Sequence, residues 1–188
     1  MNALQLPFKF DATLILQEIS QFKKEDYYDI YNPSVGLETL WSKHLIEPIG
    51  GPDQAPEFFP NEALLKCPYL LTILETFKCK KETFRIHTLE SNAAIKPHRD
   101  IGFSFEDGFI RIHIPVQTND QVQLIVNNEH IKMSAGECWY CNFNEVHEVK
   151  NKSNEPRTHL ILDCIVNDWF KDVFSKSGMN YKDEPKKS

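Results

Sequence analysis

Hydrophobic and polar positions change their period once along this chain, near residue 82. Before that point apolar residues recur at helical spacing, as in the segment that follows Asp11, a residue type that often caps helices. From residue 82 to residue 166, apolar and polar positions alternate, as they do in strands whose side chains point to opposite faces. The pattern predicts a helical region over residues 1–80 and a β-structure over residues 82–166.

Within the helical region, a second helical zone is expected over residues 34–45, and residues 61–77 resume the pattern. Asn61 is suited to cap this last helix, and Pro68 is expected to restart or kink it. The intervening segment 47–60 is dense in proline and glycine, which predicts a loop.

The β half contains seven predicted strands joined by turn signals. Short strands at this spacing favour a sandwich, a jelly roll or a small barrel. Residues 167–177 are expected to form one short helix, and residues 178–188 a loose tail. The predicted strands cover residues 83–89, 109–117, 122–127, 130–133, 137–143, 147–151 and 158–166.

The length of 188 residues predicts one domain, residues 1–188, with its own hydrophobic core. Lys and Arg number 21 against 27 Asp and Glu, and the basic residues are spread along the chain, which argues against a nucleic-acid partner. The sequence shows neither a secretory signal pattern nor an apolar run long enough to span a bilayer. We therefore expect a cytoplasmic protein without a membrane partner.

Five cysteines are scattered along the chain, and the pair Cys138 and Cys141 forms a CxxC motif. The motif lies in a segment that reads as a strand, where positions three apart point to opposite faces, so the two sulfurs are poorly placed to share a zinc ion. We expect buried, reduced thiols here.

The segment "FIRIHIPVQ", residues 109–117, has one aliphatic face and one polar face that carries Arg111 and His113. An outer strand could simply expose these two side chains to water. The alternative is that the polar face lines a site. The same alternatives apply to Arg85 and His87, for which a solvated face is the simpler expectation.

His98 and Asp100 stand two residues apart, so in an extended segment both side chains point the same way. His147 is a candidate third ligand that a compact β-fold could bring beside them. Two histidines and one carboxylate form a facial triad, which leaves metal positions open and suits non-haem Fe(II). Arg157 begins an apolar strand, where a buried guanidinium needs a carboxylate partner that a bound dicarboxylate could supply.

The segments "IKPHRDIGFSFEDGFIRIHIPVQT", "GECWYCNFNEVHEV" and "RTHLILDCIVNDW" resemble, in this order, the aspartyl/asparaginyl β-hydroxylase family of 2-oxoglutarate-dependent oxygenases. This family includes bacterial proline hydroxylases, and the similarity covers roughly residues 82 to 170. The animal aspartyl hydroxylases of the family lack the carboxylate that this chain has as Asp100. The chain therefore resembles the bacterial members more closely.

The resemblance implies a mainly β fold with flanking helices, namely a double-stranded β-helix of the jelly-roll or cupin type. It makes His98, Asp100 and His147 the Fe(II) ligands, and it places Arg157, Arg111 and His113 at the 2-oxoglutarate cosubstrate. The implied partners are dioxygen and a small substrate. His159 is either a residue that supports this site or a core histidine.

Three functions remain open at this point. The first is an Fe(II)- and 2-oxoglutarate-dependent dioxygenase that hydroxylates an unactivated carbon of a small substrate, such as an amino acid. The second is a hydroxylase of Asp or Asn residues in a protein. The third is a cupin-like module that binds metal or ligand without catalysis.

Overall fold

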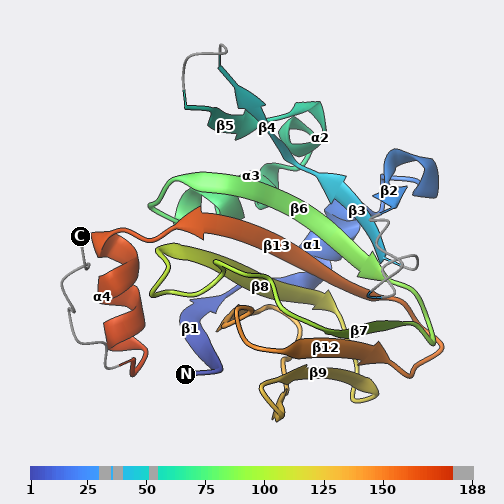
Figure 1. Ribbon diagram of the computed structural model, residues 1–188. Helices are drawn as coiled ribbons and strands as arrows, with labels where there is room; N and C mark the ends of the chain where they lie inside the picture. Colours follow the sequence, from blue (N-terminus) through green and yellow to red (C-terminus); the bar gives the residue numbers. More distant parts are fainter. Residues whose placement is uncertain (30–34, 36–39, 51–54, 180–188) are drawn as a thin grey trace.

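Two antiparallel sheets face each other in the computed structural model, which describes residues 1–29, 35, 40–50 and 55–179 (Figure 1). The larger sheet has the strand order β1-β11-β8-β13-β6-β3-β2, and the smaller sheet has the order β10-β9-β12-β7. The larger sheet consists of β1 (Ala3–Lys9), β2 (Tyr28–Asp29), β3 (Leu40–His44), β6 (Lys81–Leu89), β8 (Phe109–Gln117), β11 (Glu137–Cys141) and β13 (Arg157–Ile165). The smaller sheet consists of β7 (Ala94–His98), β9 (Val122–Val126), β10 (Glu129–Ile131) and β12 (His147–Asn151).

The eight consecutive strands β6 to β13 form the predicted double-stranded β-helix. The chain alternates between the two sheets from strand to strand, except that β9 and β10 pair as a hairpin within the smaller sheet. One hydrophobic cluster joins Leu89 and Cys141 of the larger sheet to Ile95 and Leu124 of the smaller sheet. The two sheets therefore enclose a common interior.

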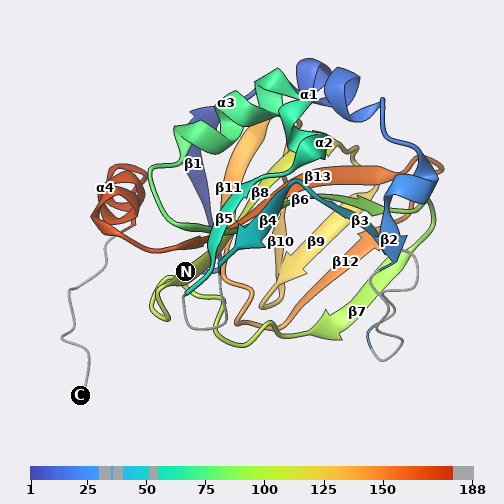
Figure 2. The ribbon, with the colours of Figure 1, turned by 90° about the horizontal axis from the view of Figure 1, so that it is seen from above.

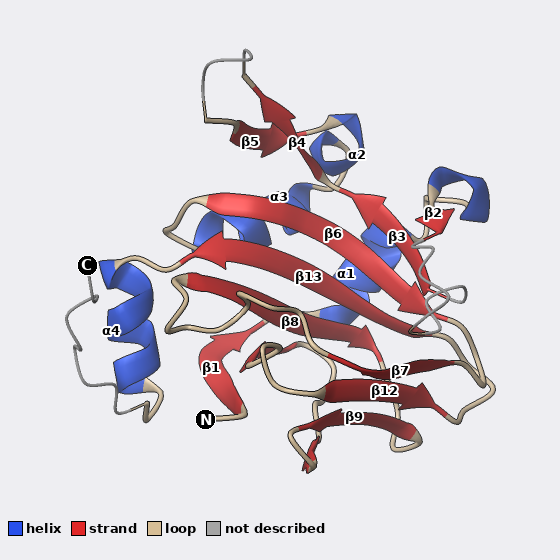
Figure 3. Cartoon of the chain, in the orientation of Figure 1, coloured by secondary structure: helices blue, strands red, loops and turns tan. Residues whose placement is uncertain are grey.

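Helices cover the other face of the larger sheet (Figures 2 and 3). The helices are α1 (Ala12–Ile19), α2 (Glu62–Leu65), α3 (Pro68–Thr76) and α4 (Asp168–Lys176), with a short 3₁₀ helix over Lys24–Asp26. Ile110, Ile112 and Ile114 of β8 belong to the same buried cluster as residues of α1 and α3. The aliphatic face of residues 109–117 thus packs against helices, and the predicted polar face is turned to the interior between the sheets.

The predicted helix starts are confirmed. The Asp11 carboxylate accepts hydrogen bonds from the backbone N–H groups of Thr13 and Leu14, and Asn61 caps α2 in the same way. Pro68 begins α3, where its missing N–H removes no helical hydrogen bond. The predicted short helix over residues 167–177 is α4, capped by Asn167.

The N-terminal region contains more strand than its helical pattern predicts. Strand β1 pairs with β11 at the edge of the larger sheet. The prediction of helix over residues 34–45 is wrong for β3, because β3 pairs with β6 and sheet pairing overrides its local pattern. Residues 34 and 36–39 lie outside the described residues. The predicted loop over residues 47–60 is wrong at both ends, where β4 (Ile46–Ile49) and β5 (Glu57–Pro60) pair as antiparallel strands, and residues 51–54 lie outside the described residues.

Both members of the CxxC motif are buried thiols, as expected. Cys138 belongs to the cluster under the helices and Cys141 to the cluster between the sheets, so they lie on opposite faces of β11. Within the described residues, the structure has no helix that combines the length and the hydropathy needed to cross a membrane.

Candidate active site

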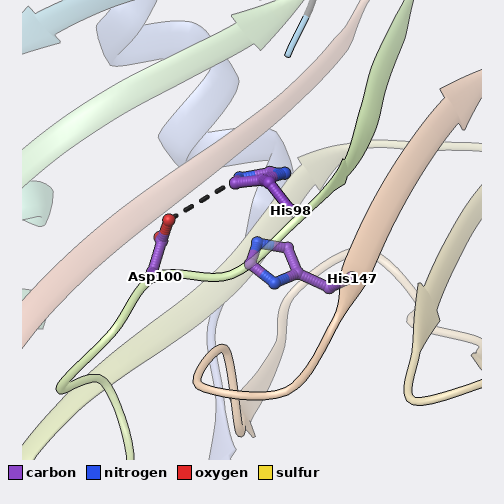
Figure 4. A group of neighbouring side chains, drawn as sticks. All are labelled: His98, Asp100 and His147. Carbon is purple, nitrogen blue, oxygen red and sulfur yellow. Dashed lines mark ion pairs between the residues drawn. The ribbon is translucent and has the colours of Figure 1, made fainter. Parts of the chain in front are cut away.

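The pairing of β12 with β7 brings two distant histidines together. His147 and His98 are direct cross-strand partners, and their ring centroids lie 4.2 Å apart. Asp100 follows β7 by two residues, and its Oδ1 lies 3.6 Å from His98 Nε2 (Figure 4). One ligand atom from each of the three side chains lies within 4.8 Å of the others. The structure thus gathers the three residues that the sequence predicts as a facial triad.

Backbone carbonyls fix the tautomer of both histidines. The Nδ1 of His98 lies 2.8 Å from the carbonyl oxygen of Lys96, and the Nδ1 of His147 lies 3.0 Å from that of Glu145. A carbonyl oxygen only accepts, so each Nδ1 carries the proton and donates. Each Nε2 therefore keeps its lone pair for a metal, with the ring oriented by a hydrogen bond two residues upstream.

Burial keeps the second histidine of this group neutral. His147 is only 5% exposed, and this burial lowers its pKa. A neutral imidazole is the form that binds a metal. Two imidazole nitrogens and one carboxylate oxygen suit a divalent transition metal such as Fe(II), with coordination positions left open.

Arg111 lies beside the triad but already has carboxylate partners. Its Nε and Nη2 donate to the two oxygens of Asp163 at 2.7 and 3.1 Å, and its Nη1 donates to Asp100. Its guanidinium carbon also lies 4.3 Å from the ring centroid of Phe103. The polar face predicted for Arg111 is confirmed, and its guanidinium bridges two carboxylates, the partly exposed Asp100 and the buried Asp163.

Arg157 is buried deeper in the interior, with a side chain that is 3% exposed. Its Nη2 donates to His159 Nδ1 at 2.8 Å, and His159 Nδ1 lies 3.2 Å from His113 Nδ1. No carboxylate of the described residues forms an ion pair with Arg157, and its Nε has no hydrogen-bond partner among them. Burial without a counter-charge lowers the pKa of Arg157 to about 9. Arg157 is therefore a buried cation that lacks an anion.

A cavity reaches this cation. Arg157 and His159 contribute to the wall of a cavity of about 410 Å³, together with apolar residues such as Leu124 and Met133. Aromatic and imidazole rings connect the same region to the triad, since Phe143 lies 4.9 Å from His113 and 4.6 Å from His147 between ring centroids. The triad residues do not themselves line this cavity; Phe143, His113 and His159 form a row of ring contacts between His147 and Arg157.

Two further residues on the polar faces were expected to be solvated, and this expectation is wrong. The Arg85 side chain is only 14% exposed and lies 3.2 Å from Asp163, and His87 Nε2 is buried without a partner among the described residues. Asp163 was not predicted as a site residue at all. The sequence feature that could have revealed Asp163 is its position on the same face as Arg157 and His159, in a strand that is otherwise mostly apolar.

Because two histidines of the interior are buried, we expect the stability of the folded protein to depend on pH. Burial holds the pKa values of His113 and His159 well below the ordinary value, so they stay neutral in the folded protein while the unfolded chain protonates below about pH 6.5. The free energy of unfolding of the metal-free protein should therefore fall between pH 7.5 and 5.5, by up to about 1.4 kcal/mol per pH unit for each histidine.

Denaturant unfolding at the two pH values measures this change. In His159→Gln, the fall in the free energy of unfolding between pH 7.5 and 5.5 should be smaller by the contribution of one histidine. An equal free energy of unfolding at pH 7.5 and 5.5 would show that these rings are not held neutral by the fold.

The fold and the three gathered side chains define a class. A double-stranded β-helix with two histidines and an aspartate between its sheets is the architecture of cupin-like metal proteins and of 2-oxoglutarate–Fe(II) oxygenases. Within this class, the chain belongs to the aspartyl/asparaginyl beta-hydroxylase family, whose model matches residues 11–166. The family resemblance found in the sequence is thus confirmed over most of the chain.

A relative that is named for its activity matches part of the chain. The L-proline cis-4-hydroxylase of Rhizobium meliloti (strain 1021) is 32% identical over 98 residues, which cover 51% of this chain and 35% of that protein. The match therefore spans only about a third of that relative's length.

Solved structures match the fold more completely. An oxidoreductase of the 2OG-Fe(II) oxygenase family from Burkholderia pseudomallei aligns with a TM-score of 0.58 and 13% identity, over 87% of this chain and 84% of that chain. The non-heme alpha ketoglutarate dependent epimerase SnoN from nogalamycin biosynthesis has the same TM-score at 10% identity, over 96% of this chain and 85% of that chain. At these identities the likeness concerns the fold.

Proposed function

We propose that the protein is an Fe(II)- and 2-oxoglutarate-dependent dioxygenase that hydroxylates a small substrate, an amino acid or a derivative of one. The observation that carries this proposal is Arg157, a buried guanidinium without a carboxylate partner, in the same interior as a histidine-aspartate-histidine group. Burying a cation without an anion is costly, so such a residue indicates a site for an anionic ligand.

The residues fit both implied groups. In the proposal, His98 and His147 bind Fe(II) through the Nε2 atoms that their backbone hydrogen bonds leave free, and Asp100 supplies one oxygen. Arg157 holds the distal carboxylate of 2-oxoglutarate with its planar fork of donors. When both groups are bound, they supply the activation of dioxygen and the transfer of oxygen to an unactivated C–H bond.

Other residues shape the site around these groups. His113 and His159 remain neutral because they are buried, so each can donate or accept one hydrogen bond beside the cosubstrate carboxylate without adding charge. Phe143, which is 3% exposed, packs its ring against both His113 and His147. Because Arg157 is buried, its attraction to a bound carboxylate would be screened less than at the surface.

The amino-acid substrate rests on the similarity to the proline hydroxylase of Rhizobium meliloti. A proposed cytoplasmic location agrees with the five free thiols, four of which are buried. Hydroxylation of Asp or Asn in a protein, the activity for which the family is named, is the second candidate.

Turnover tests the proposal. We expect the iron-loaded protein to convert 2-oxoglutarate to succinate faster with a suitable free amino acid, L-proline being the first choice, than with no substrate. Succinate formation stimulated only by Asp- or Asn-containing peptides would favour the second candidate. Iron binding without any succinate formation across both panels would favour a binding module that does not catalyse.

A further inference from the structure

Asp163 is the most heavily bonded carboxylate of the described residues. It is 2% exposed and lies on the interior face of β13, two residues before the end of the strand. It accepts hydrogen bonds from Arg111 Nε at 2.7 Å, Arg111 Nη2 at 3.1 Å, Thr83 Oγ1 at 2.9 Å and Arg85 Nη2 at 3.2 Å. Burial alone would raise the pKa of Asp163, but the two guanidinium groups hold it below the ordinary value. Asp163 is therefore a fixed negative charge.

The sheet register makes the contact with Arg111 rigid. Asp163 and Arg111 are direct partners across β13 and β8, so their side chains leave the larger sheet side by side on the same face. A bidentate pair of this kind fixes the orientation of the guanidinium plane. The third nitrogen, Nη1, then points at Asp100, and Phe103 covers the face of the group.

Asp100 depends on this contact for its orientation. It lies in the turn after β7, outside any strand, and its side chain is a quarter exposed. Arg111 binds Oδ2, which leaves Oδ1 on the side of His98 Nε2, 3.6 Å away. Without Arg111, the described contacts would leave the carboxylate free to rotate about its side-chain bonds.

The charges also balance within this group. Two guanidiniums, Arg85 and Arg111, share two carboxylates, Asp163 and Asp100. Arg111 is thus saturated by groups of the chain itself, whereas Arg157 has no such partner. The resemblance placed both arginines at the cosubstrate, but in the structure only Arg157 of the two has a guanidinium free to bind a carboxylate of a ligand.

We propose that Asp163 is a positioning residue for the metal centre: it anchors Arg111, and Arg111 holds Asp100 with one oxygen presented to the metal. The inference rests on the proposed function in so far as His98, Asp100 and His147 bind a metal. It assigns Arg111 to the support of a metal ligand and leaves Arg157 as the arginine that binds cosubstrate.

Co(II) affinity tests the inference without any turnover, because binding of Co(II) can be followed by its visible absorption. In Asp163→Asn the dissociation constant for Co(II) should rise about 10- to 100-fold, the usual effect of removing a group that orients a ligand. The dissociation constant for 2-oxoglutarate, measured on protein saturated with Co(II), should change by less than about threefold. A purely structural lesion would not separate the two affinities in this way.

Thr88→Val is the matched control. Like Asp163→Asn, it removes a hydrogen bond between β6 and β13, here the 3.1 Å bond between Thr88 and Thr158, but it leaves the contacts of Arg111 and Asp100 intact. Its Co(II) affinity should equal that of the unaltered protein. Near-ultraviolet circular dichroism checks that each variant is folded.

Arg111→Lys is a second test variant. It is needed because Asp163→Asn removes the negative charge that pairs with two buried guanidiniums, which could prevent the variant from folding. Lysine keeps the charge but cannot bridge two carboxylates with a planar fork, so Co(II) affinity should again fall while cosubstrate affinity at saturating Co(II) is kept. Arg111→Lys decides the test if Asp163→Asn does not fold.

Two results would overturn the inference. One is unchanged Co(II) affinity in folded Asp163→Asn or Arg111→Lys. The other is a large loss of 2-oxoglutarate affinity in Arg111→Lys with Co(II) binding intact, which would return Arg111 to the cosubstrate. The failure of the proposed function looks different, since the unaltered protein would then bind Co(II) but not 2-oxoglutarate, and the Asp163 comparison could still be made.

Discussion

Replacing Arg157 by methionine should make the ligand-free protein more stable, by about 1–3 kcal/mol, because it removes a buried charge and fills the same space with an apolar side chain. The expectation depends on the burial of Arg157 and on the lack of a carboxylate partner among the described residues. Most substitutions of buried residues destabilise, so a gain in stability would be a specific signature. Thermal and denaturant unfolding measure it.

The same variant should lose its response to cosubstrate. With metal present, 2-oxoglutarate at 100 times its dissociation constant should stabilise the unaltered protein by about 2.7 kcal/mol and should not stabilise Arg157→Met measurably. Arg99→Met is the control, because Arg99 is half-exposed and its contacts, a long 3.8 Å ion pair with Glu145 and a 3.1 Å hydrogen bond to the Asn144 carbonyl, lie at the surface, so its loss should change stability by less than about 0.5 kcal/mol. A destabilised Arg157→Met that still responds to 2-oxoglutarate would contradict this role for Arg157.

His147→Ala should lose the metal while keeping the fold. Its ring supplies one of three possible ligand atoms within 4.8 Å of one another, and β12 stays paired with both β7 and β9 through backbone hydrogen bonds. Removal of a direct ligand should weaken Fe(II) binding by more than the ten- to hundredfold that is typical for residues behind the ligands. Metal content after anaerobic gel filtration, together with circular dichroism, measures both properties.

His130→Ala is the matched control for this experiment. His130 is an exposed histidine of the same smaller sheet, on β10, and is not part of the gathered group. Its loss should leave bound iron unchanged. If His147→Ala also retained its iron, His113 or His159 would have to be considered as the third ligand.

The alternating pattern predicted the functional half of the fold well, because each face of a strand has one environment. The isoleucines of residues 109–117 pack under the helices, and Arg111 and His113 face the interior, as their positions two apart require. The hydrophobic pattern gave the wrong element where pairing with a neighbouring strand decides the structure. Leu40–His44 reads as helix in isolation, but β6 offers it a free edge in the larger sheet.

The H-x-D pair was recognisable in the sequence, and the family resemblance singled out His147 from the other histidines as the third member of the group. The contact between Arg111 and Asp163 was not predictable, since 52 residues separate them and only the register of β8 against β13 makes them neighbours. Strand β7 was missed because it is short and contains Pro97, a residue that weakens strand patterns. Its pairing with β12 is nevertheless what joins His98 to His147.

The central claim is that a metal at His98, Asp100 and His147 and an anion at Arg157 form one cosubstrate site. An anaerobic titration of the Fe(II)-loaded protein with 2-oxoglutarate tests it most directly, because a 2-oxo acid that chelates iron produces a visible metal-to-ligand charge-transfer band. We predict that the band grows with 2-oxoglutarate and saturates. Bound iron without such a band would contradict the claim and would leave the triad as a metal site alone.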